Sequence, residues 1–254
     1  MHEGKTLRTV ITFPHKDDEE VKAHRAAHHE KSALIFLHGL DDKPASWQES
    51  IEWLAGKISP NAKAVCPAAP VAAITKNGGE QMTAWCDVYE PWPLTLKSRD
   101  DTAGLGASVK SIHGVIDQLI ADGVPSHRII VGGFSQGAAT ATLATYTYGK
   151  RLGGCLNLSG WLPNRADFAA SLQPANKSTP LFWGHGQKDE VIAFEMQAAG
   201  VEVLSAHGIP VTAKHYDMGH DSSEAEFDNI IHFLHYALAW GVAATPIICP
   251  QCSH

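Results

Sequence analysis

The sequence predicts an α/β fold in which a mostly parallel central sheet is covered by helices on both faces. From residue 31 onward, short apolar runs alternate with segments of helical periodicity, the pattern of repeated βα units. Most of these runs are nearly continuously apolar, as expected for strands buried on both faces. A serine flanked by glycines also lies between one such run and a helical segment. We predict one domain over residues 31–240, an N-terminal extension over 1–30 and a C-terminal tail over 241–254.

The predicted strands share short runs of aliphatic and aromatic residues, and we expect each of them to be a buried central strand. They cover residues 33–37, 64–66, 129–131, 155–158, 181–183 and 211–215.

The clearest predicted helix has Leu105, Val109, Ile112 and Ile116 at spacings of three and four residues and ends at Asp122-Gly123. Two further helices are predicted over 136–148 and 224–240. No internal repeat or low-complexity linker divides the chain.

Composition argues against several classes of partner. The net charge of −7 and pI near 6.1 provide no basic field for nucleic acid or an anionic membrane. No apolar run approaches the roughly 18 residues of a transmembrane helix, and the first residues do not resemble a signal peptide. Five scattered cysteines are typical of reduced thiols, so we expect a cytoplasmic protein.

The two ends of the chain contain residues of types that also bind metals. The extension holds His15, His24, His28 and His29 beside a potential edge strand at 7–13, and the tail holds Cys249 and Cys252. The histidines lie in a polar segment and the cysteine pair has no second pair nearby, so we expect no metal site and no cofactor.

Ser135 lies at the centre of a G-x-S-x-G motif between a strand and a helix. Gly133 and Gly137 supply the small neighbours that a tight strand-to-helix turn requires. Such a turn exposes the hydroxyl above the sheet, beside the amides of a helix N-terminus. The alternative is a serine that merely caps a helix.

A serine hydroxyl needs an imidazole to remove its proton, and the imidazole needs a carboxylate to orient it. Asp189 follows the strand 181–183, and His220 follows the strand 211–215. The order serine, acid, histidine is that of the α/β-hydrolase fold. Asp217 and Glu190 are rival acids. Other histidines are less suitable as the base. His38 and His185 lie beside glycines at strand ends, where we expect structural roles, and His207, His232 and His235 lie in or near helical segments.

After the first core strand, Gly39 allows the backbone to turn and expose an amide. The amides of Leu40 and Gln136 are therefore the predicted donors to an oxyanion. The alternative for His38-Gly39 is an ordinary turn at a strand end.

Taken together, these motifs resemble the acyl-protein thioesterase, lysophospholipase and carboxylesterase family of small α/β-hydrolases, over about residues 32–239. Several blocks carry the resemblance: Leu37-His-Gly-Leu-Asp-Asp42; Pro67-Ala-Ala-Pro70 with Asn77-Gly-Gly79 and Ala84-Trp-Cys-Asp87; Gly132-Gly-Phe-Ser-Gln-Gly137; Leu158-Ser-Gly-Trp-Leu-Pro163; and Gly184-His-Gly186 with Asp189 and Met218-Gly-His220.

The resemblance implies the Ser135, Asp189, His220 triad and the Leu40 and Gln136 donors. It also implies an apolar acyl channel, with ordinary core packing as the alternative role for each candidate; the candidates are Leu40, Ile74, Met82, Trp85, Trp161 and Leu162. Asp41 stands where the family usually has glycine, so we expect a different loop shape or added negative charge there.

The sequence thus predicts a serine hydrolase that cleaves carboxylic esters or thioesters through an acyl-enzyme. Its candidate substrates are an S-acylated protein and a lysophospholipid. The alternative is a small-molecule receptor or scaffold that keeps the fold without turnover.

Overall fold

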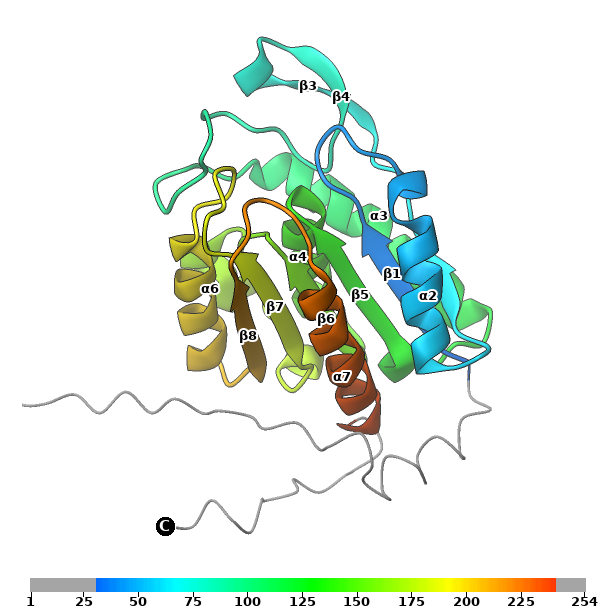
Figure 1. Cartoon of the computed structure of the whole chain (residues 1–254). Helices are drawn as coiled ribbons and strands as arrows, with labels where there is room; N and C mark the ends of the chain where they lie inside the picture. The colour runs from blue at the N-terminus through cyan, green and yellow to red at the C-terminus, as the bar shows by residue number, and fades with distance from the viewer. Residues whose placement is uncertain (1–30, 241–254) are drawn as a thin grey trace, which may run out of the picture.

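A computed structural model describes residues 31–240. Within them, parallel strands form one sheet in the order β2-β1-β5-β6-β7-β8 (Figure 1). The strands are β1 (Ala33–Leu37), β2 (Lys63–Val65), β5 (Ile129–Phe134), β6 (Gly154–Leu158), β7 (Leu181–Gly186) and β8 (Val211–Tyr216). The predicted fold class is confirmed.

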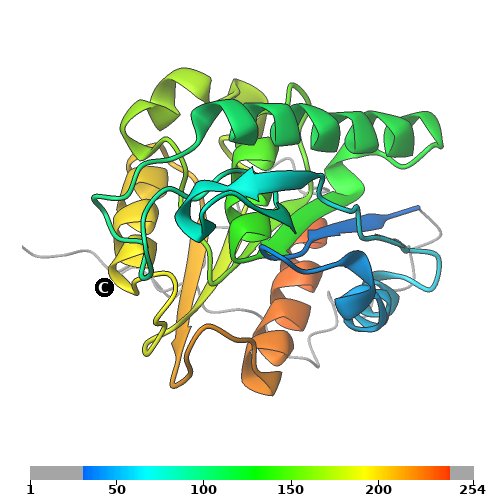
Figure 2. The same cartoon turned by 90° about the horizontal axis from the view of Figure 1, so that it is seen from above.

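Helices cover both faces of this sheet (Figure 2). They are α2 (Gln48–Ile58), α3 (Thr102–Ala121), α4 (Gln136–Thr147), α5 (Phe168–Ser171), α6 (Glu195–Ala206) and α7 (Glu224–Trp240). Short 3-10 helices lie in the connections, at Pro44–Ser46, Thr75–Asn77, Ser126–Arg128, Arg165–Asp167 and Pro174–Asn176.

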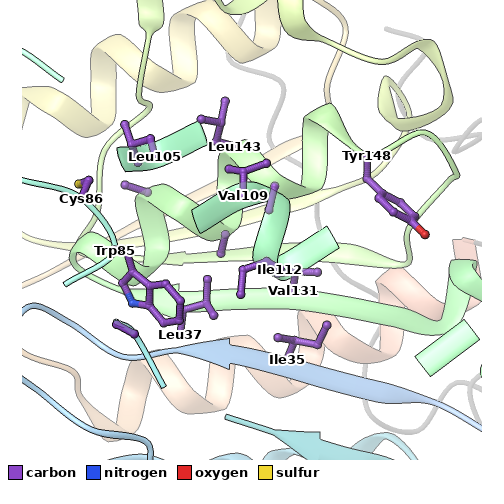
Figure 3. Packing of buried hydrophobic residues seen from close by; sticks show 14 of the residues in the cluster. Ile35, Leu37, Trp85, Cys86, Leu105, Val109, Ile112, Val131, Leu143 and Tyr148 are labelled. Atoms are coloured by element: carbon purple, nitrogen blue, oxygen red, sulfur yellow. The ribbon is translucent and has the colours of Figure 1, made fainter. Parts of the chain in front are cut away.

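Alternate residues of each buried strand pack into different layers, because successive side chains of a strand point to opposite faces. In β1, Leu34 and Phe36 join the cluster that contains α2 and α7. Ile35 joins the opposite cluster, with Val109 and Ile112 of α3 (Figure 3). This two-sided burial explains the continuous apolar runs in the sequence.

The prediction that every strand is central and buried is wrong for β2 and β8. Each forms an edge of the sheet, and their side chains are largely half-buried or exposed. The residue types at 64–66 and 211–215 do not reveal whether a strand has one neighbouring strand or two. The helices α2 and α6 were not predicted, nor was the antiparallel hairpin of β3 (Val71–Ile74) and β4 (Glu80–Thr83).

The predictions for the two ends of the chain lie outside the described residues. These are the extension with its strand at 7–13 and its histidines, and the tail with Cys249 and Cys252. Across residues 31–240, no helix combines the length and the apolar character needed to cross a bilayer.

Because the strands are parallel, their carboxyl ends meet at one edge of the sheet. The loops after β1, β5, β6, β7 and β8 all leave from this edge, and the β3–β4 hairpin lies above it (Figure 1). In open parallel sheets, functional loops gather at such an edge.

Candidate active site

Ser135 stands at the junction of β5 and α4 in an unusual backbone conformation. Its φ of 55° lies in the left-handed region that non-glycine residues rarely adopt. Its amide donates to the carbonyl of Leu158 at 2.8 Å, which ties the turn to β6.

The glycines of the motif allow this turn to lie close to β1. A Cβ atom at Gly137 would overlap the carbonyl oxygens of Leu37 and His38, and one at Gly133 would overlap the backbone of Gly137. The motif therefore brings Ser135 next to the loop that follows β1.

Three predicted site residues come together although they are far apart in the sequence. Nε2 of His220 lies 2.8 Å from Oγ of Ser135, and Nδ1 of His220 lies 2.8 Å from Oδ2 of Asp189. The carboxylate accepts the Nδ1 proton, so Nε2 is left to accept the proton of the serine hydroxyl. The His220 side chain is 13% exposed, whereas that of Asp189 is fully buried.

The surroundings of Asp189 favour its ionised form. Burial alone would raise the pKa of Asp189, but hydrogen bonds from His185 and His220, the charge of His220 and the amide of Ile192 outweigh it. The pKa of Asp189 is thereby held well below its ordinary value. Oδ1 accepts the amides of Val191 and Ile192, each at 2.8 Å. A carboxylate so held stays charged and oriented at neutral pH.

The rival residues occupy other positions. Asp217 is exposed and pairs with Nζ of Lys188 at 2.5 Å. His38 is buried; its Nδ1 donates to the carbonyl of Gly39 at 2.8 Å, and its Nε2 accepts the amide of Ala69 at 3.1 Å. His207 bonds the carbonyl of Val203 within its own helix region.

The two predicted oxyanion donors line the same pocket as Ser135 and His220. The Gln136 amide is the first of α4, and the first amides of a helix have no acceptor within that helix. The Gln136 side chain is fixed, since it accepts the amide of Trp85 and donates to the carbonyl of Cys86, each at 2.7 Å. Leu40 lies beside it in the loop that follows β1.

Asp41 replaces the glycine expected in that loop and adopts a left-handed φ of 58°. Aspartate tolerates this region better than most residues. Its amide donates to the carbonyl of Thr83 at 2.8 Å, and the Thr83 hydroxyl donates to the carbonyl of Asp42 at 2.7 Å. These bonds join the loop to the β3–β4 hairpin.

The pocket above Ser135 has a volume of about 330 Å³. Its apolar lining consists of Leu40, Met82, Val88, Trp92, Phe134, Trp161 and Val191, and its polar rim includes Asp41, Asp42, Lys76 and Asn77. Of the predicted channel residues, Leu40, Met82 and Trp161 lie here.

The other predicted channel residues lie elsewhere. Ile74 and Trp85 are buried in the core cluster, where Nε1 of Trp85 donates to the carbonyl of His38 at 2.8 Å. Leu162 lines a neighbouring pocket of about 190 Å³, which shares Trp161 with the first.

Sequence reasoning missed Val88, Trp92, Phe134 and Val191 as lining residues. Val191 carries a usable signal, because it follows the predicted acid by two residues in the same strand-end loop. Trp92 carries none, since its loop has no periodicity.

In residues 31–240, no group of three or more His, Cys, Asp or Glu side chains is arranged to hold a metal ion. Cys66, Cys86 and Cys155 are free thiols.

Comparisons with known proteins give a consistent result. A family model described as phospholipase/carboxylesterase matches residues 16–238. Acyl-protein thioesterase 1 of Gibberella zeae is 35% identical over 215 residues, spanning 82% of this chain and 92% of that protein. The crystal structure of Arabidopsis thaliana SOBER1 has a TM-score of 0.76 at 31% identity, covering 82% of this chain and 99% of that one.

The crystal structure of Zea mays acyl-protein thioesterase 2 has a TM-score of 0.72 at 30% identity, covering 84% of this chain and 96% of that one. The family model spans the strands and loops that form the site. The chain therefore belongs to the phospholipase/carboxylesterase family of α/β-hydrolases.

Proposed function

We propose that Ser135, His220 and Asp189 form the catalytic triad of this chain, which its family membership makes a hydrolase of carboxylic esters or thioesters. The observation that carries the proposal is the pair of 2.8 Å contacts that join the serine hydroxyl to His220 and His220 to Asp189. Hydrogen-bond reach between nucleophile, base and orienting acid is the geometric requirement for this chemistry.

In the first step, His220 Nε2 removes the hydroxyl proton while Ser135 Oγ attacks the carbonyl carbon of the substrate. The carbonyl electron pair moves to oxygen, and the backbone amides of Leu40 and Gln136 donate to the oxyanion. When the intermediate collapses, the leaving alcohol or thiol takes the proton from His220. The acyl group stays on Ser135 as an ester.

In the second step, His220 removes a proton from water, and the resulting hydroxide attacks the acyl carbon. Collapse releases the carboxylic acid, and Ser135 Oγ recovers its proton from His220. Asp189 remains ionised throughout and stabilises the imidazolium that forms in each step.

The acyl group of the substrate would lie in the apolar pocket, whose lining includes Met82, Trp92, Trp161 and Val191. Its volume of about 330 Å³ lies at the small end of the range for ligand pockets, about 300–1,000 Å³. An S-acylated protein and a lysophospholipid both present an acyl chain for such a pocket. The acyl-protein thioesterases among the relatives support a thioester as the substrate of this chain. Its cytoplasmic location stays a prediction.

Replacing the nucleophile tests the assignment. Ser135→Ala should reduce hydrolysis of a short p-nitrophenyl ester by at least about 10³-fold, because the acyl-enzyme can no longer form. Ser50→Ala, on α2, should keep the wild-type rate and serves as the matched control. Circular dichroism should show that both variants are folded. Full activity in folded Ser135→Ala would overturn the triad.

A fluorophosphonate probe separates the enzyme from a non-catalytic receptor with the same fold. Only an activated serine reacts quickly with this reagent. We expect mass spectrometry to place the label on Ser135 in the wild type, and no label on Ser135→Ala.

A further inference from the structure

The carboxylate of Asp189 lies against two histidines. Oδ2 is 2.8 Å from Nδ1 of His220 and also 3.3 Å from Nε2 of His185. The side chains of His185 and Asp189 are both fully buried. His185 comes from the end of β7, at the start of the loop that carries the acid.

A second contact fixes the tautomer of His185. Its Nε2 lies 3.0 Å from the carbonyl oxygen of Ile192, which can only accept a hydrogen bond. The proton is therefore on Nε2, and this one N–H is shared between the carbonyl of Ile192 and Oδ2 of Asp189. Nδ1 is buried and has no partner among the described residues.

These bonds hold both oxygens of the acid. Oδ1 accepts the amides of Val191 and Ile192, while Oδ2 faces the two imidazoles. The contact from His185 to Ile192 also joins the two ends of the loop that contains Asp189. The positions of both histidines therefore bear on the place of Oδ2.

We propose that His185 is a positioning residue for the reaction, whose Nε2–H holds Oδ2 of Asp189 where it accepts the proton of His220 Nδ1. The inference rests on the proposed triad and adds a fourth side chain to it. Through Asp189, His185 fixes the orientation of the His220 ring and therefore the direction of Nε2 toward Ser135. His185 touches neither the substrate nor the reacting atoms.

A purely structural role is the competing explanation, in which His185 only ties β7 to Ile192. Such a role would affect stability but not the turnover of folded molecules. His185→Leu removes the donor and keeps much of the volume, whereas His185→Gln keeps an N–H at the end of a chain of similar reach. The two variants therefore separate packing from hydrogen bonding.

We expect His185→Leu to lower kcat for a p-nitrophenyl ester by about 10- to 100-fold, with KM within about twofold of wild type. His185→Gln should be faster than His185→Leu and recover at least a third of the difference in log kcat between wild type and His185→Leu. Rates are expressed per active site, with the folded fraction measured by circular dichroism. A wild-type kcat in folded His185→Leu, or equal losses in both variants, would overturn the proposal.

A double-mutant cycle with Asp189→Asn tests whether His185 acts through the acid. The double variant, His185→Leu with Asp189→Asn, should be no slower than Asp189→Asn alone. If the fold losses of the two single variants instead multiply in the double variant, the inference is overturned. If Asp189→Asn alone kept full activity, the acid assignment of the triad would fail instead. A slow Asp189→Asn beside a fully active His185→Leu would reject only the role of His185.

Discussion

Two buried carboxyl groups, those of Asp189 and Glu226, differ in the hydrogen-bond donors around them. Asp189 accepts two amides and the imidazole of His220, and its pKa is held below the ordinary range. Glu226, in the first turn of α7, is fully buried and neither carboxyl oxygen has a partner among the described residues. Burial, together with the charge of Asp221, raises the pKa of Glu226 from its ordinary value of 4.5 to about 8.

This shift links the stability of the fold to pH. The folded chain holds the Glu226 proton more tightly than the unfolded chain, so its contribution to stability is complete below about pH 4.5. The contribution falls as the pH rises and is lost once the pH passes about 8. From the size of the shift, the loss is at most about 5 kcal/mol.

Glu226→Gln should flatten the dependence of stability on pH. We expect its free energy of unfolding, relative to wild type, to improve by several kcal/mol between about pH 5 and pH 9. Urea denaturation at each pH measures this difference, and Glu224→Gln, in the same helix turn, is the control. The readout is the slope of the free energy of unfolding against pH, because the buried amide in Glu226→Gln also changes stability by an amount that does not depend on pH. Parallel curves for wild type and Glu226→Gln would contradict the prediction.

Residue type and position in strand-end loops were enough to predict the three residues that the structure brings into contact. Serine, aspartate and histidine each follow a recognisable apolar run, and the fold directs those loops to one edge. Both Trp85 and Trp161 pack in the same core cluster, and the same reasoning could not show that only Trp161 also lines the pocket. An aromatic residue after a loop motif is consistent with either place. Nor does sequence show that Glu226 is buried, since acidic residues in a first helical turn are commonly exposed.

At the scale of elements, the strand-to-helix turn from β5 to α4 depends on close approach to β1. The obstacles around a Cβ at Gly137 are backbone atoms of Leu37 and His38, which cannot move aside as a flexible side chain can. This approach places the first amides of α4 beside the loop that contains Leu40.

Gly137→Ala should therefore destabilise the fold by about 3 kcal/mol or more, because β1 and α4 must separate. Gly149→Ala is the matched control, since a Cβ there meets nothing within 4 Å. We expect the midpoint of urea unfolding to fall for Gly137→Ala and to stay near wild type for Gly149→Ala. An unchanged midpoint for Gly137→Ala would show that the turn can relax.

Several elements were predicted close to their observed bounds. Strand β1 was predicted with its observed bounds, and helices α3, α4 and α7 to within a few residues. Regular apolar spacing indicated α3 and α7, whereas α4, which is buried nearly all round, was indicated by the glycine-flanked serine before it. The β3–β4 hairpin was missed, since Glu80–Thr83 has no apolar alternation and its two-stranded sheet is separate from the main one. Whether β2 and β8 form edges depends on strand order, which local composition does not encode.

At the scale of the molecule, the site is assembled on strands of one sheet from residues that are far apart in the sequence. Ser135 follows β5, Asp189 follows β7 and His220 follows β8, so the contacts of the proposed triad exist only when these strands are paired. The site and the sheet should thus be lost together on unfolding.

We expect fluorophosphonate labelling and far-ultraviolet circular dichroism to fall at the same urea concentration. Coincident midpoints are the signature of one cooperative transition. Labelling that disappears well before the dichroism signal would show instead that the loops with Asp189 and His220 open while the sheet remains folded.

The edge of the sheet where the strands begin contains none of the site residues. The turn before β6 lies there, and Gly149 and Lys150 within it are exposed. A cysteine engineered at Lys150 would allow the protein to be immobilised on a solid support through that side. The mouth of the pocket would then face away from the support and stay open to dissolved reagents.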